Sequence, residues 1–166
     1  MKLKKSPLAP EKFPSLPYVK GLKIGTSKSN IRYKNRQDIL TVTFDNLASV
    51  AGVFTLSQIP AAPVNFCKKN LINGYAKGLV VNAGIANSFT GKKGINNNRK
   101  IANYFSKLIN ARQKDVFVCS TGVIGEQLPL LKTKRAIKSS YLSKKKNVEN
   151  AAKAIMTTDT FPKASG

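Results

Sequence analysis

Residues 115–126 read Asp115-Val116-Phe117-Val118-Cys119-Ser120-Thr121-Gly122-Val123-Ile124-Gly125-Glu126, an apolar run that leads into small, hydroxyl-bearing and glycine residues. The β-branched and aromatic residues at its start predict a buried strand, and the residues from Ser120 to Gly122 predict a turn at its end. A turn in this place holds a hydroxyl and backbone N–H groups in fixed directions. Enzymes stabilise a developing oxyanion with donors that are fixed in this way.

Thr121 and Gly122 are therefore candidate catalytic residues, with the threonine hydroxyl and the glycine N–H as oxyanion donors. The alternative is an ordinary tight turn, in which glycine adopts an unusual backbone angle and threonine bonds locally. Composition by itself favours the ordinary turn. The choice between the two depends on whether other segments of the chain support a site.

A second strand-to-turn segment precedes the first, with the sequence Leu79-Val80-Val81-Asn82-Ala83-Gly84-Ile85-Ala86-Asn87-Ser88-Phe89-Thr90-Gly91. Its polar and glycine residues Asn82, Gly84, Asn87 and Thr90 are candidates for the lining of a substrate pocket. The alternative is that the asparagines satisfy hydrogen bonds within their own turn, as they commonly do in glycine-rich loops.

The remaining periodicity predicts a mixed α/β fold, with helices that cover a partly antiparallel sheet. Residues 38–44 and 48–56 are expected to pair as an antiparallel hairpin, with a turn at Asp45-Asn46. Further strands are expected at residues 20–27, 79–81 and 116–119, and helices at residues 60–71, 95–109, 130–142 and 148–156. Residues 1–19 form a proline-containing leader that we expect to be extended, and residues 20–166 form the folded domain.

Composition places the protein among ordinary globular chains, because 42% of its 166 residues are hydrophobic and 8% are aromatic. No apolar run approaches the roughly 20 residues that a membrane-spanning helix needs. The basic N-terminus is not followed by the apolar core of a secretory signal. We therefore expect a cytoplasmic protein without a membrane segment.

The charge is strongly basic, with 29 lysines and arginines against 7 acidic residues and a net charge of +22. A small nucleic-acid-binding protein is the alternative function that this charge supports. The other explanation is a lysine-rich, well-solvated surface. The basic residues are spread along the chain and form no zinc-finger, RNP-type or GXXG motif, so nucleic acid is the less favoured partner.

The chain contains no histidine and two cysteines, Cys67 and Cys119. A Ser-His or Cys-His nucleophile pair and a histidine-ligated metal site are therefore excluded, and we expect no metal. A buried free thiol is the ordinary state of each cysteine. A nucleophilic Cys119 is disfavoured, because the chain has no histidine and the strand around Cys119 is apolar.

A cluster of hydroxyl and carboxyl groups, Met156-Thr157-Thr158-Asp159-Thr160, follows the last expected helix. Thr157 is a candidate for a hydrogen bond to the amide of a substrate. The alternative is that these short polar side chains end the helix and form a turn.

Together these segments resemble the glutamate/ornithine N-acetyltransferase family of the cyclic arginine pathway. Five matches occur in order along nearly the whole chain, and this is more specific than any single motif. They are Ser6-Pro7-Leu8-Ala9-Pro10, then Ala51-Gly52-Val53-Phe54-Thr55 with Ala61-Ala62-Pro63-Val64, then residues 81–91, then residues 120–126, and finally Ala154-Ile155-Met156-Thr157-Thr158-Asp159-Thr160-Phe161-Pro162-Lys163.

The resemblance implies a layered α-β-β-α fold of the type found in N-terminal-nucleophile-like ornithine acetyltransferases. Such enzymes are made as a precursor that cuts itself before a threonine, and two α and two β chains then form a heterotetramer. The freed threonine is the nucleophile and its own amine is the base, so no histidine is needed. The acetyl group passes from N-acetylornithine to glutamate, and bifunctional members also accept acetyl-CoA; no other cofactor is implied. By motif, Thr121 and Gly122 correspond to the oxyanion hole and Thr157 to a substrate contact.

The sequence departs from the family pattern in one respect. The Ala-Thr-Met-Leu segment that carries the nucleophile is absent, and so is the Lys-Gly-Ser-Gly lead-in before it. We therefore expect the chain to be the N-terminal, α-chain part of such an enzyme, either truncated or encoded separately from the remainder. It would supply one wall of an incomplete site and be inactive alone, with the β chain or C-terminal half as its partner.

Overall fold

The computed structural model describes residues 4–143 and 147–165, so the first three residues of the expected leader lie outside it. It confirms the mixed α/β class. In chain order the elements are β1 (Leu22–Ser27), β2 (Ile39–Ser49), α1 (Ala62–Leu71), β3 (Tyr75–Ile85), α2 (Gly91–Leu108), the short 3-10 helix η1 (Gln113–Asp115), β4 (Val116–Val123), α3 (Leu130–Ser143) and α4 (Val148–Ile155).

The strands form one four-stranded sheet in the order β1-β2-β3-β4. The pairs β1–β2 and β2–β3 are antiparallel, whereas β3 and β4 run parallel. A parallel pair needs a long crossover, and α2 supplies it here. The carboxyl ends of β3 and β4 therefore meet at one edge of the sheet, the arrangement that brings the two expected turns together.

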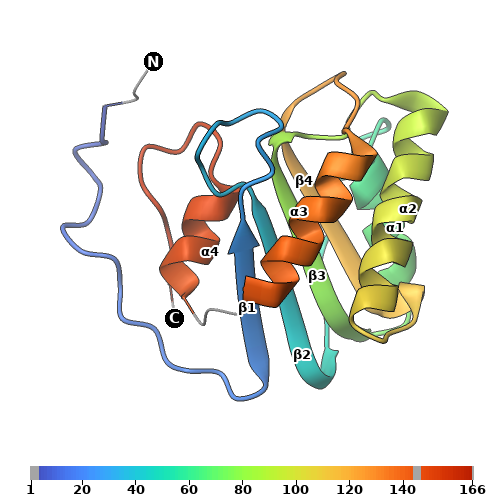
Figure 1. Ribbon diagram of the computed structural model, residues 1–166, viewed down its shortest axis with the longest axis horizontal. Helices are drawn as coiled ribbons and strands as arrows, with labels where there is room; N and C mark the ends of the chain where they lie inside the picture. The colour runs from blue at the N-terminus through green and yellow to red at the C-terminus, as the bar shows by residue number, and fades with distance from the viewer. Residues whose placement is uncertain (1–3, 144–146, 166) are drawn as a thin grey trace.

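One face of the sheet is covered by α2 and α3, which lie side by side in Figure 1. Val80 and Val118 point into this layer and are 2% exposed, and they pack against Phe105 of α2 and Ile137 of α3, which are fully buried. Strand side chains alternate between the two faces, so this face takes every second residue of each strand. It holds the largest apolar cluster among the described residues.

The opposite face is covered at its two sides by α4 and α1. Ile24 and Leu40 pack against Ala151 and Ala154 of α4. At the other side Phe117 packs with Cys67 of α1. Between them, the apolar side chains of Val42, Leu79 and Val81 are only partly buried.

The expected strand at residues 48–56 is wrong. Ala48 and Ser49 are the last residues of β2, and residues 50–61 contain no helix or strand. The strand β2 continues through Asp45 and Asn46, where a turn was expected, with an irregularity in its pairing between Thr43 and Ala48. Two of the apolar residues that suggested this strand are not buried, since Val53 is 98% exposed and Leu56 is 97% exposed.

The other elements lie close to their expected positions, but β3 and β4 are longer than predicted. Both continue through the glycine-containing segments that we expected to be turns, so Asn82, Gly84, Thr121 and Gly122 lie in strands. The reason is tertiary, because each segment pairs with the other. Residues 4–20 contain no helix or strand, and among the described residues no helix has both the length and the apolar character to cross a membrane.

The contact between β1 and α3 depends on Gly25, and we expect Gly25→Ala to destabilise the fold. A Cβ atom there would lie 1.9 Å from the carbonyl oxygen of Ser140 and 2.9 Å from Oγ1 of Thr41. Neither the helix backbone nor the buried threonine can yield easily, so we expect a loss of about 2–3 kcal/mol in the free energy of unfolding.

Urea denaturation measures this loss, with Gly52→Ala as the matched control. A Cβ atom at Gly52 would meet one side-chain atom at 4.0 Å, so stability should change by less than about 0.5 kcal/mol. Equal midpoints for the two variants would show that β1 and α3 do not approach each other this closely.

Candidate functional site

The candidate site lies at the carboxyl ends of β3 and β4, where Thr121 pairs with Ala83 and Gly122 pairs with Gly84. Gly122 has a φ of +128°, and a Cβ atom on it would lie 2.3 Å from the carbonyl carbon of Gly84. Only glycine fits both conditions. The backbone at Gly122 is therefore held against the neighbouring strand, and the direction of the adjoining peptide groups is fixed.

Thr121 points to the face of the sheet that α2 and α3 do not cover. Side chains alternate along a strand, so Thr121 shares its face with Phe117 and Cys119. Phe117 is buried against α1, whereas Cys119 is exposed and Thr121 is partly exposed. The partly exposed Thr121 side chain is therefore directed to this open side of the sheet.

The backbone of β4 is also open along its outer edge, since β4 is the last strand of the sheet. Side chains of α1 occupy part of this edge. Asn70 Nδ2 donates to the carbonyl oxygen of Val116 (2.9 Å), and the Cys67 thiol donates to the carbonyl oxygen of Val118 (3.2 Å). Backbone groups alternate in direction along a strand, so the N–H of Gly122 points to the same outer edge.

Asn82 and Gly84 are placed on the covered side of the sheet. Asn82 is 5% exposed; its amide donates to the carbonyl oxygen of Ile85 (2.8 Å), and its Oδ1 accepts from the hydroxyl of Ser120 (2.6 Å). A Cβ atom at Gly84 would lie 2.8 Å from the Cβ of Arg32. Both residues therefore have internal roles, away from the face that carries Thr121.

Asn87 and Thr90 hold the turn before α2. The Thr90 hydroxyl donates to Oδ1 of Asn87 (2.8 Å), and Asn87 Nδ2 donates to the carbonyl oxygen of Gly94 (3.2 Å). Asn87 is 1% exposed and has a φ of +49°, a conformation that asparagine tolerates better than most residues. The Thr90 hydroxyl thus pairs with Asn87 Oδ1, and the Asn87 amide group pairs with the helix backbone.

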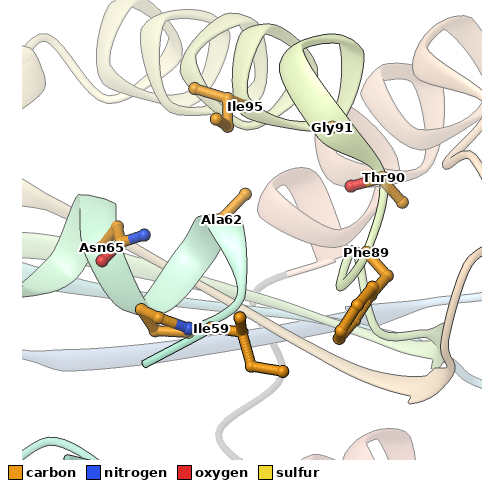
Figure 2. Close-up of a pocket in the computed structure, with 8 residues that line it drawn as sticks. Ile59, Ala62, Asn65, Phe89, Thr90, Gly91 and Ile95 are labelled. Atoms are coloured by element: carbon orange, nitrogen blue, oxygen red, sulfur yellow. The ribbon is translucent and has the colours of Figure 1, made fainter. Parts of the chain in front are cut away.

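Thr90 also lines a cleft of about 460 Å³ between α1 and the start of α2, shown in Figure 2. The cleft is largely apolar, with Phe89 and Ile59 close together on one side and Ile95 of α2 on another. Of the expected pocket residues, Thr90 is the one that lines it. Asn82, Gly84 and Asn87 do not.

Thr157 lies just after α4, in the turn that contained the polar cluster. Its backbone N–H donates to Oδ2 of Asp159 (3.3 Å). The Lys163 ammonium donates to the same carboxylate and, with the Thr157 N–H, lowers the pKa of Asp159 below its ordinary value. The backbone of Thr157 is thus held by a charged neighbour, while its side chain is partly exposed.

The loop at residues 28–37 links these segments, and no sequence pattern predicted its role. Buried Asp38 anchors the loop by accepting hydrogen bonds from the N–H and the hydroxyl of Ser29, each at 2.6 Å. Arg36 donates to the carbonyl oxygen of Met156 and stacks on Tyr33 at 4.3 Å, and Tyr33 in turn lies against Gly84. No sequence motif predicts such a loop. Its basic residues do not stand out, because basic residues are spread along the whole chain.

The loop also carries an ion pair to the segment after β4, in which Arg32 Nη1 donates to Oε1 of Glu126 (3.1 Å). Thr121, Gly122 and Thr157 thus belong to segments that one loop connects. Within residues 4–143 and 147–165, no three histidine, cysteine, aspartate or glutamate side chains gather in a way that could hold a metal ion.

Comparisons of this chain with a family model, with curated proteins and with solved structures all indicate the same family. The model of the ArgJ family matches residues 23–166. Arginine biosynthesis bifunctional protein ArgJ from Mesorhizobium japonicum and that from Rhizobium meliloti are each 47% identical over 161 residues. These matches cover 96% of this chain and 39% of each relative, so the chain spans about two fifths of the curated relatives' length.

Two solved structures are similar at 29% identity. Ornithine acetyltransferase from Mycobacterium tuberculosis, in complex with ornithine, matches with a TM-score of 0.80 over 84% of this chain and 77% of that chain. Arginine biosynthesis bifunctional protein ArgJ from Bacillus halodurans matches with a TM-score of 0.76 over 85% of this chain and 74% of that one.

The close approach of Gly122 to Gly84 predicts that Gly122→Ala is more harmful than Gly125→Ala. Both glycines have a positive φ, but a Cβ atom at Gly125 would have open space around it. The strain of a positive φ is thus common to both variants, and the clash with backbone is added only at Gly122. We expect Gly122→Ala to lower the free energy of unfolding by about 1–3 kcal/mol more than Gly125→Ala. Urea denaturation of both variants measures the difference. Equal losses in the free energy of unfolding would contradict the close contact between Gly122 and Gly84.

The hydrogen bond between Thr90 and Asn87 predicts that Thr90→Val destabilises the chain by about 1–3 kcal/mol. Valine keeps the shape of threonine but leaves the buried Oδ1 of Asn87 without its donor. Thr43→Val, at a partly exposed position of β2, is the control and should change stability by less than about 0.5 kcal/mol. Thermal unfolding measures the stability of both variants. If Thr90→Val were as stable as the unchanged chain, the hydrogen bond from Thr90 to Asn87 would not be important for the fold.

Proposed function

The chain belongs to the ArgJ family, and from this premise we propose that it forms part of an acetyltransferase of arginine biosynthesis. The proposed reaction moves an acetyl group from N-acetylornithine to glutamate, with acetyl-CoA as a second donor. The names of the relatives support the pathway, and the ornithine complex of the Mycobacterium tuberculosis relative supports the class of substrate.

The proposed role of this chain is to supply the oxyanion hole. The observation that carries it is the close packing of Gly122 on Gly84, which fixes the end of β4. The Thr121 hydroxyl and the Gly122 N–H would donate to the acetyl oxygen as it becomes negative. Donors that are already oriented need no reorganisation during the reaction, so they lower the barrier.

Thr157 is the proposed contact to the substrate. It lies in a turn that Asp159 and Lys163 hold through charge-assisted hydrogen bonds. A hydroxyl on a turn fixed in this way can bond to an amide of the acetylated amino acid at little cost in entropy. The loop at residues 28–37 connects this turn to the end of the parallel strand pair.

The nucleophile is proposed to come from outside this chain. The sequence has no histidine to activate a serine or cysteine, and it lacks the Ala-Thr-Met-Leu segment. A threonine activated by its own freed amine, on a β chain or C-terminal part, would complete the site. Two α and two β chains would then form the full enzyme.

This division of roles predicts that the isolated chain has no acetyltransferase activity. Acetyl transfer from N-acetylornithine to glutamate, followed by mass spectrometry of N-acetylglutamate, measures it. The control is a complete ArgJ enzyme under the same conditions. Robust turnover by this chain alone would refute the proposal that the reacting group lies elsewhere.

In the enzyme assembled with its nucleophile-bearing part, we expect Thr121→Ala to lower kcat by about 10²-fold, because one oxyanion donor is lost. Thr121→Ser keeps the hydroxyl and should retain most of the activity. Steady-state kinetics with N-acetylornithine distinguish the two, and KM should change little. An alanine variant with unchanged kcat would remove Thr121 from the chemistry.

A further inference from the structure

The two cysteines of the chain come together at the outer edge of β4. Cys67 lies on α1, and its thiol donates to the carbonyl oxygen of Val118 (3.2 Å) and accepts from the N–H of the same residue (3.4 Å). That carbonyl belongs to the peptide bond that leads to Cys119. Cys67 and Cys119 are 52 positions apart in sequence, yet the Cys67 sulfur rests on the backbone beside Cys119.

The proximity of the two thiols has opposite effects on their pKa values. The neighbouring Cys67 thiol lowers the pKa of Cys119, because it favours the Cys119 thiolate. The same proximity, together with burial, raises the pKa of Cys67. The pair is therefore asymmetric, because the pKa of Cys119 lies below its ordinary value and the pKa of Cys67 lies above it.

Exposure follows the same division. Cys119 is exposed on the open face of the sheet, whereas Cys67, on α1, is only 6% exposed. The exposed member can meet a reagent from solvent, and the buried member can react only with its neighbour. This is the arrangement of an attacking thiol with a resolving thiol beside it.

We propose that Cys67 and Cys119 form a reversible intramolecular disulfide when the protein meets a peroxide. The Cys119 thiolate attacks one peroxide oxygen, forms an S–O bond and breaks the O–O bond, which gives a sulfenic acid; the departing alkoxide or hydroxide takes up from solvent the proton that Cys119 lost on ionising and leaves as an alcohol or water. Cys67 then attacks the Cys119 sulfur, forms the S–S bond and releases water, and its proton leaves with that water. Two thiols and one peroxide thus give one disulfide, one alcohol (or water) and one water.

A disulfide needs its sulfur atoms about 2.0 Å apart, so a side-chain rotation must close the distance between the two thiols. The Cys67 sulfur lies 3.2 Å from the carbonyl oxygen of Val118, on the peptide that leads to Cys119. Cys119 is exposed, so its side chain is free to make that rotation. Lys68 and Lys69, which follow Cys67 in the last turn of α1, add positive charge to the same helix end.

The disulfide would tie α1 to β4 two residues before Thr121, on the same face of the strand. It would therefore fix the open edge of β4 and place a sulfur bridge beside the candidate oxyanion donor. Formation of this disulfide does not require acetyl transfer, because it involves only the two thiols and their surroundings.

The test is oxidation of the reduced chain by hydrogen peroxide at neutral pH. We expect the intact mass to fall by two hydrogens while the chain remains a monomer on a non-reducing gel, and dithiothreitol should reverse the change. A tryptic digest without reductant should then join the peptide that ends at Lys68 to the peptide that ends at Lys132, which carry the two cysteines. Disulfide-linked dimers, or over-oxidised Cys119 beside a free Cys67, would overturn the proposal.

Two variants and an alkylation experiment test the roles of the individual thiols. In Cys67→Ser the Cys119 sulfenic acid should persist and be trapped by dimedone, whereas Cys119→Ser should resist peroxide. In the reduced chain, iodoacetamide should modify Cys119 at least about tenfold faster than Cys67, and this preference should vanish in concentrated urea. Equal rates in the folded chain would overturn the assignment of Cys119 as the attacking thiol.

Discussion

The close contact between the backbones of Gly84 and Gly122 is the constraint on which the rest of this structure depends. It joins the carboxyl ends of two parallel strands at a distance that no side chain would allow. Because both residues are glycines with positive φ, the strands can continue together past the point where each was expected to turn. The direction of Thr121, next to this contact, follows from it.

The two faces of the sheet differ in chemistry as a consequence. The face under α2 and α3 holds the main apolar cluster, and the buried side chains of Asn82 and Asn87 each donate a hydrogen bond to a backbone carbonyl. The other face carries Thr121 and Cys119, and α1 and α4 cover it only at its sides. Reactive or exposed groups are thus gathered on one surface, while the opposite surface maintains the fold.

Local patterns predicted much of this architecture, because hydrophobic periodicity reports which residues are buried. The helices α2 and α4 and the strand β1 follow from it within a few residues. The pattern failed at residues 48–56, where apolar alternation occurs in an exposed segment, and at the carboxyl ends of β3 and β4. There the deciding contacts are with distant residues, and a local pattern contains no information about them.

The sequence by itself determined the mixed α/β class, the exclusion of histidine chemistry and the ArgJ kinship, since composition and ordered motifs are properties of the chain alone. Only the tertiary structure decided that Thr121 lies on the open face of the sheet, that Asn82 and Gly84 lie on the covered side, and that Asn87 and Thr90 lie in the turn before α2. It alone placed the loop at residues 28–37 against Gly84, and it alone brought Cys67 to Cys119. The physical reason is that strand pairing and helix packing join residues far apart in sequence, and the face to which a side chain points is fixed only when its partner strand is in place.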